Sequence, residues 1–252
     1  MDKSEDNTPI NAAKELLGSV TRVTLQLSNL CNYTHLHELC PTSVYTEKEI
    51  LPAAVVWDVI DTLAECDFNR GKTVAWHVYN EPLLDPRLAL FTKYARKHLS
   101  LIDILVFTNG WYLNDTLCGD LIDCGVTTFF LSAYTDADAD RFRALQETYK
   151  DRVAIKIGRW HSLKPWILHG KPRETTKGAP CAAPLRDLTI RASGHIGMCC
   201  LDWKETWTAG NVKELGFARA MAENYEKITS LYAELKSGYR SQEFCRICPK
   251  HR

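Results

Sequence analysis

Strand-like and helix-like segments alternate along the first 160 residues, and this alternation constrains the fold more than any other feature. Short β-rich runs predict strands, and the segments between them repeat apolar residues at helical spacing. The runs and repeats predict strands at 21–28, 73–79, 102–107, 127–132 and 153–157, with helices over 46–66, 85–99, 115–124 and 138–149. Strands separated by helices form βαβ units on a parallel sheet. The sequence therefore predicts an α/β fold, as a partial barrel or an open doubly wound sheet.

The pattern changes after residue 160. Residues 160–180 are rich in Pro, Gly, Lys and Arg and predict an irregular connection. A hairpin over 187–199, turning at Ser193 and Gly194, and a helix over 217–236 are expected beyond it. Thr46 is placed to cap the helix expected over 46–66. From the whole pattern we expect the chain to have three parts. The parts are a polar lead-in with a short helix at 11–17 (1–20), a main α/β domain (21–170) and a small C-terminal domain (171–252).

Charge and composition narrow the function. The 252 residues include 31 basic and 31 acidic ones, so nothing in the charge supports a nucleic-acid or membrane partner. The N-terminus lacks the apolar stretch of a signal peptide, and no segment reaches membrane-spanning length, so we expect a cytoplasmic protein. Structural disulfides are rare in that compartment, and the 10 cysteines therefore indicate metal binding or reactivity.

The loop after the first strand reads CNYTHLHELC over residues 31–40 and holds two cysteines and two histidines. Thiolate and imidazole bind soft and borderline metals, so we interpret the segment as a metal-binding loop. Two buried cysteines beside two surface histidines are the alternative. Three further polar segments, 80–82, 108–110 and Ser132, end the next strands, and ligands gather at such strand ends in α/β folds.

A second set of cysteines lies near the C-terminus. Its members, in order, are Cys181, Cys199, Cys245 and Cys248. Four thiolates can hold a four-iron four-sulfur cluster or a zinc ion, so both remain open on these residues alone. Cys200 is adjacent to Cys199 and is treated as spare.

In this order the motifs resemble those of the radical S-adenosylmethionine enzymes, from about residue 21 to the C-terminus. The resemblance implies a partial (β/α)6 barrel with a C-terminal twitch domain, a smaller relative of the SPASM domain. It also implies S-adenosyl-L-methionine and two four-iron four-sulfur clusters as cofactors. Cys31 and Cys40 would hold the core cluster, and the four C-terminal cysteines would hold the auxiliary one.

The core loop departs from the three-cysteine pattern of this superfamily. His37 keeps the final x2-Cys-Pro spacing and is favoured as third ligand over His35, which keeps the opening interval. A neutral imidazole raises the reduction potential of a cluster, which would make cleavage of the cofactor harder.

The same resemblance assigns cofactor-binding residues. Asn80 and Glu81 stand where the family has Gly-Gly-Glu-Pro, which receives the methionine ammonium group. The other candidates for contacts to the cofactor are Asn109, Ser132, Lys156 and Arg159. Aromatic and basic residues over 159–173 could cover a substrate that carries a phosphate or carboxylate.

The layout resembles aminocyclitol dehydrogenases of butirosin-type antibiotic biosynthesis. This implies an oxidoreductase that abstracts hydrogen from a small sugar, aminocyclitol or nucleoside-type substrate through a 5′-deoxyadenosyl radical, with the auxiliary cluster handling one electron. Flavodoxin or ferredoxin would supply electrons. The alternatives are peptide maturation, sulfur insertion, and a non-catalytic iron-sulfur or zinc protein.

Overall fold

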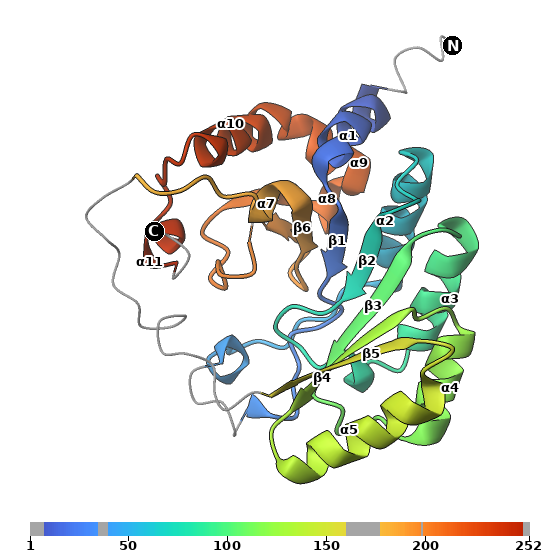
Figure 1. The fold of residues 1–252 in the computed structure, drawn as a ribbon. Helices are drawn as coiled ribbons and strands as arrows, with labels where there is room; N and C mark the ends of the chain where they lie inside the picture. Colours follow the sequence, from blue (N-terminus) through green and yellow to red (C-terminus); the bar gives the residue numbers. More distant parts are fainter. Residues whose placement is uncertain (1–7, 35–39, 160–176, 198, 249–252) are drawn as a thin grey trace.

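The computed structural model describes residues 8–34, 40–159, 177–197 and 199–248. Its centre is an eight-stranded sheet with the order β5-β4-β3-β2-β1-β6-β7-β8. Six strands are parallel and curve into an open barrel: β1 Arg22–Leu25, β2 Thr73–Trp76, β3 Asp103–Thr108, β4 Thr128–Ala133, β5 Ala154–Arg159 and β6 Asp187–Ile190 (Figure 1). This confirms the partial (β/α)6 barrel expected from the sequence.

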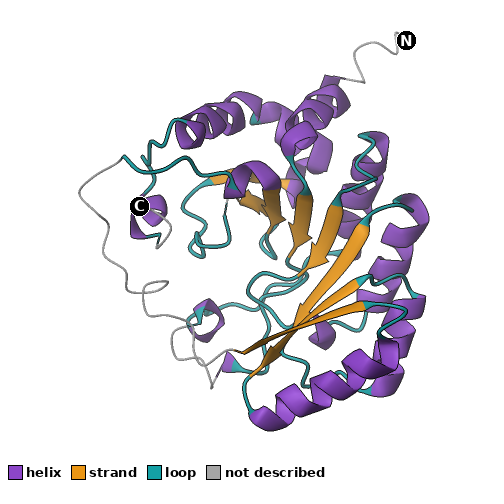
Figure 2. Cartoon of the chain, in the orientation of Figure 1, coloured by secondary structure: helices purple, strands orange, loops and turns teal. Residues whose placement is uncertain are grey.

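Helices cover the outer face of the barrel, as Figure 2 shows. They are α2 Ala53–Glu65, α3 Leu88–His98, α4 Asp115–Asp123 and α5 Asp136–Tyr149, with the short turns η2 Pro41–Ser43 and η3 Pro82–Leu84. Val23 and Leu25 of β1 and Ile104 of β3 point toward these helices and are fully buried. Side chains alternate along a strand, so their neighbours face the interior of the barrel.

The C-terminal part continues the same sheet. β6 pairs in parallel with β1 and in antiparallel with β7 (His195–Gly197), which pairs with β8 (Thr208–Asn211). The hairpin expected at 187–199 is therefore present. Its helices are α7 Ala183–Arg186, α8 Val212–Leu215, α9 Phe217–Glu223, α10 Tyr225–Lys236 and α11 Glu243–Ile247. The predicted boundary at residue 170 lies outside the described residues.

The first helix, α1 (Thr8–Ser19), packs against α9 and thus joins the N-terminal segment to the C-terminal part of the chain. The Lys72 ammonium group donates to the carbonyl oxygens of Leu17 at 3.3 Å and Gly18 at 3.2 Å, where α1 ends. Such cationic contacts stabilise the negative end of a helix. No helix in the described part of the chain is both long enough and apolar enough to span a bilayer.

Two predicted helices have different bounds in the structure. The helix expected from Thr46 begins only at Ala53, so Thr46 does not cap it. Leu51 donates its backbone N–H to Leu27 at 2.8 Å, which keeps the preceding residues extended beside the chain after β1. The helix expected over 217–236 is divided at Asn224 into α9 and α10.

Candidate active site

The loops after β1, β2 and β3 meet at one edge of the sheet, as the βαβ pattern predicts. The backbone N–H of Glu81 donates to Leu30 at 2.8 Å, which joins the loop after β2 to the loop after β1. The Asn109 side-chain Nδ2 donates to the side-chain Oδ1 of Asn32 at 2.7 Å, which joins the loop after β3 to the same segment. The beginning of the cysteine loop is therefore held from two sides.

Glu81 is the anchor of this edge. Its side chain is buried, and its carboxylate accepts hydrogen bonds from the Thr108 hydroxyl at 2.6 Å, the Asn109 N–H at 2.8 Å and the Leu83 N–H at 3.0 Å. Burial raises the pKa of Glu81, and these three donors oppose that rise. Glu81 therefore fixes the strand ends, and at most part of its acceptor capacity is left for a cofactor ammonium group.

Asn80 differs from Glu81 because the described residues leave its side chain without hydrogen bonds. Its side-chain oxygen and nitrogen are both buried, and neither has a hydrogen-bond partner among the described residues. A buried amide without partners is costly, and such groups are usually satisfied by a ligand or water. The amide offers both an acceptor and donors, which fits the ammonium and carboxylate of a methionine group. The chemistry of Asn80 thus suits the cofactor-binding role predicted for it.

The two described cysteines of the loop lie beside this anchor. Cys31 accepts a hydrogen bond from the Tyr33 N–H at 3.4 Å, and the Thr42 hydroxyl donates to the buried Cys40 sulfur at 3.1 Å. Burial raises the pKa of Cys31 to about 11. His35 and His37 lie outside the described residues, so the choice of third ligand stays a prediction.

The remaining cofactor candidates line the far side of the barrel. Ser132 is half-buried on β4, opposite Gly158 of β5. The Lys156 ammonium lies 5.0 Å from the centre of the Phe130 ring, whereas Arg159 forms an ion pair with Asp136 at 2.8 Å. Arg159 is therefore already paired within the chain. The basic and aromatic residues over 160–173 are not among the described ones.

The C-terminal cysteines lie within reach of one another's charges. Burial raises the pKa of Cys245 to about 12, with smaller contributions from Cys181 and Cys248. The hydrogen bond with Cys200 and burial raise the pKa of Cys199, to which Cys245 adds a smaller contribution. Among the described residues, however, no three His, Cys, Asp or Glu side chains are gathered closely enough to bind a metal ion. Four thiols suit a cluster chemically, and their assignment as its ligands stays a prediction.

A row of six side chains crosses the inner face of the barrel. Lys156 is the member of this row that was predicted from the sequence as a site residue. The His77 and Phe107 rings stack at 4.3 Å, and the Phe107 and Phe130 rings stack at 4.4 Å. Burial, and then the charges of Arg22 and Arg191, lower the pKa of His77 to about 4. His77 is therefore neutral at physiological pH. The whole row is Arg191, Gln26, His77, Phe107, Phe130 and Lys156, which occupy or directly follow paired strand positions.

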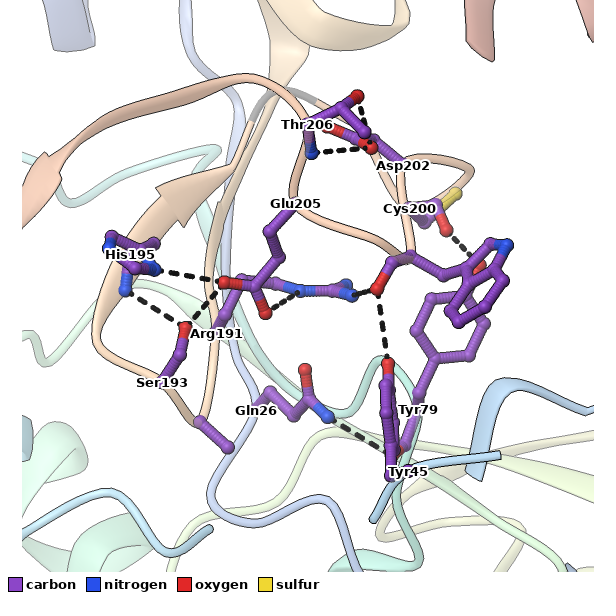
Figure 3. Close-up of polar contacts among 12 residues, drawn as sticks. Gln26, Tyr45, Tyr79, Arg191, Ser193, His195, Cys200, Asp202, Glu205 and Thr206 are labelled. Carbon is purple, nitrogen blue, oxygen red and sulfur yellow. Dashed lines mark hydrogen bonds and ion pairs between the residues drawn. The ribbon is translucent and has the colours of Figure 1, made fainter. Parts of the chain in front are cut away.

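A polar cluster lies at the β6 end of this row (Figure 3). Glu205 accepts from the Ser193 hydroxyl at 2.6 Å and pairs with the His195 ring at 3.0 Å and with Arg191 at 3.4 Å. The Tyr79 hydroxyl donates to the carbonyl oxygen of Cys200. One feature of the sequence could have revealed this cluster. Arg191 directly follows the strand Asp187–Ile190, at a position where the alternation of side chains places it on the inner face of the barrel.

Three comparisons agree with this architecture. A family model described as SPASM, an iron-sulfur cluster-binding domain, matches residues 181–249. The S-adenosyl-L-methionine-dependent 2-deoxy-scyllo-inosamine dehydrogenase of Niallia circulans is 23% identical over 241 residues, which cover 90% of this chain and 91% of that protein. The match therefore runs through both parts of the chain.

Solved structures show the same fold. BtrN in complex with AdoMet and 2-DOIA matches with a TM-score of 0.74 at 22% identity, over 91% of this chain and 93% of that one. Native anSMEcpe with bound AdoMet matches with a TM-score of 0.55 at 12% identity, over 90% and 86%. These matches confirm the recognition made from the motifs: the chain has the radical S-adenosylmethionine fold with a SPASM-type C-terminal domain.

Proposed function

We propose that this chain is a radical S-adenosylmethionine oxidoreductase that abstracts hydrogen from a small sugar, aminocyclitol or nucleoside-type substrate in natural-product biosynthesis. The observation that carries the proposal is the similarity to a S-adenosyl-L-methionine-dependent dehydrogenase over 90% of this chain. The SPASM match covers all four C-terminal cysteines, which supports an auxiliary cluster. When bound, the core cluster and S-adenosyl-L-methionine supply a 5′-deoxyadenosyl radical.

The residues of the chain position these groups. We assign Cys31, Cys40 and His37 to the core cluster, and Cys181, Cys199, Cys245 and Cys248 to the auxiliary one. The unpartnered amide of Asn80 is placed to bind the amino-acid part of the cofactor. Glu81 holds that part of the site rigid through its three hydrogen bonds. Lys156 and Ser132 complete the wall across the barrel.

The proposal includes a reducing partner and a compartment. Flavodoxin or ferredoxin would deliver the electron that starts the reaction. We place the protein in the cytoplasm, where ten cysteines without disulfides are chemically stable.

Anaerobic reconstitution tests the cofactors. Two clusters require about eight irons per chain. We expect Cys199→Ser to lose about half of the iron, since four of eight irons belong to one cluster. Cys200→Ser is the matched control and should keep the full iron content. A zinc-containing protein, or equal iron in the wild type and Cys199→Ser, would contradict the auxiliary-cluster assignment.

Formation of 5′-deoxyadenosine under reduction tests the activity. The wild type should form it, and His37→Ala should lose it together with about four irons, whereas His35→Ala should retain both. Loss in His35→Ala alone would transfer the ligand role to His35. A wild type that binds iron but never cleaves S-adenosyl-L-methionine would favour a non-catalytic iron-sulfur protein, an outcome that the two-cysteine loop makes worth testing.

A further inference from the structure

Arg191 carries a buried positive charge that the chain satisfies only in part. Its side chain is 1% exposed, and its Nη1 atom has no hydrogen-bond partner among the described residues. Its Nε lies 3.4 Å from a Glu205 oxygen, and its Nη2 lies 3.4 Å from the Trp203 carbonyl oxygen. Both distances exceed the usual 2.7–3.2 Å range of N–H···O bonds. The guanidinium group is thus held loosely and has a donor to spare.

The counter-charge of Arg191 is shared. One oxygen of Glu205 accepts from the Ser193 hydroxyl at 2.6 Å and lies 3.0 Å from His195 Nδ1, both closer than Arg191 is to the other oxygen. Glu205 also has a positive φ of 53°, a conformation that is strained for a residue other than glycine. Asp202 maintains this turn, because its carboxylate accepts from the Thr206 N–H at 3.0 Å and the Trp207 N–H at 2.9 Å.

The location of Arg191 joins the two parts of the proposed site. Arg191 directly follows β6, next to Gln26, and its guanidinium carbon lies 5.0 Å from the centre of the Tyr79 ring. Tyr79 in turn contacts Cys200, in the segment that follows Cys199 (Figure 3). Arg191 therefore lies between the inner face of the barrel and the loop that carries a predicted auxiliary-cluster ligand.

Among the described residues, the acids that the row reaches are already engaged by donors of the chain: Glu205 by Ser193 and His195, and Glu81 by the ends of the strands. Lys156 stands at the opposite wall and has no ion pair within the described chain, and Glu81 is engaged by three donors. Burying a cation is strongly unfavourable unless an anion pairs with it. Carboxylate and phosphate match the planar, two-pronged geometry of a guanidinium group. The unsatisfied Nη1 donor and the long, shared contact with Glu205 both favour an anion brought by a ligand.

We propose that Arg191 binds a carboxylate or phosphate group on the small substrate, so that the substrate is an anionic sugar, aminocyclitol or nucleoside derivative. This rests on the proposed function for the identity of the ligand as substrate. S-adenosyl-L-methionine also carries a carboxylate, and the same guanidinium chemistry would suit it. The experiment therefore titrates the cofactor and the anionic probes separately.

Isothermal titration of the reconstituted full-length protein tests the proposal in phosphate-free buffer. The probes are myo-inositol 1-phosphate and glucuronate, each against its neutral counterpart, myo-inositol and glucose, in the presence of S-adenosyl-L-methionine. We expect at least one anionic probe to bind about tenfold or more tightly than its counterpart, the range expected for a hydrogen bond to a charged group. Arg191→Gln should remove this preference, and Arg191→Lys should restore part of it.

Lys204→Gln is the matched control, because Lys204 is an exposed cation of the same loop and should be dispensable. The proposal is overturned if no anionic probe binds at millimolar concentration, if Arg191→Gln keeps the preference, or if it weakens S-adenosyl-L-methionine instead. If Arg191→Gln fails to fold, equal binding of charged and neutral probes by the wild type, or loss of the preference in Arg191→Lys, overturns it.

The two proposals fail separately. Formation of 5′-deoxyadenosine without any preference for anions removes the role of Arg191 and leaves the proposed function. If the protein prefers anions through Arg191 but never forms 5′-deoxyadenosine, the proposed function fails and the anion-binding role of Arg191 remains.

Discussion

The half-buried His77 should make the protein lose stability as the pH falls below 6.5. Burial and the charges of Arg22 and Arg191 lower the pKa of His77 from 6.5 to about 4. Between these values the unfolded chain binds a proton at this position and the folded chain does not, so acidification favours unfolding. At about 1.4 kcal/mol per pH unit, the effect approaches about 3 kcal/mol across the window and is about 2 kcal/mol at pH 5.

His77→Phe isolates this contribution, because a phenyl ring can keep the stacking on Phe107 that the imidazole makes at 4.3 Å. The assay is anaerobic urea unfolding of wild type and variant at pH 7.5 and pH 5. Other titrating groups and any acid lability of the clusters are common to both proteins, so the difference between their losses belongs to His77. We expect the wild type to lose about 2 kcal/mol more than the variant. Equal losses would refute the reasoning.

Three further substitutions test the anchoring role of Glu81, the turn after β3 and the cofactor-binding role of Asn80. Glu81→Gln should destabilise the protein by about 2 kcal/mol, because either orientation of the amide turns its NH₂ toward at least one of the chain's donors; urea unfolding measures this. Gly110→Ala should lower the melting temperature by several degrees, since φ is +68° and a Cβ atom would lie 2.5 Å from the Phe142 ring. Asn80→Ala should weaken S-adenosyl-L-methionine binding about tenfold in equilibrium titration, with little loss of stability, because the amide has no hydrogen-bond partner among the residues that the structure describes.

Two of these substitutions have a matched control in the chain. Glu47→Gln replaces an exposed carboxylate and should leave stability unchanged. Gly18→Ala lies in α1 with open space around a new Cβ atom and should be neutral or slightly stabilising. An Asn80→Ala variant that binds the cofactor normally would remove Asn80 from the site, and a Glu81→Gln variant as stable as Glu47→Gln would contradict the anchoring role.

The sequence was sufficient for the alternation of strands and helices, whereas the choice of a partial barrel over an open sheet came from the resemblance to the radical S-adenosylmethionine enzymes. Runs such as Asp103–Thr108 are bounded by turn signals and separated by helices, so their existence and order could be predicted. The start of α2 was misplaced, because the cap-like Thr46 precedes an extended segment that pairs with the chain after β1. Long-range pairing of this kind leaves no local signal.

Some residues of the candidate site could likewise be predicted from the sequence, and others could not. Asn80, Glu81 and Asn109 were identified because they follow strands, where parallel sheets place their ligands. The role of Glu81 was less accessible, since its three donors come from two different loops. Arg191 and Glu205 were missed because a charged residue in a hairpin or loop is usually solvated, whereas Arg191 is buried and contacts the Trp203 carbonyl oxygen and the Tyr79 ring.

Because β6 is hydrogen-bonded to β1 on one side and to β7 on the other, the two parts of the chain share one continuous sheet. Truncation before this strand would not yield a smaller enzyme; it would expose an unprotected edge of β1 that invites aggregation.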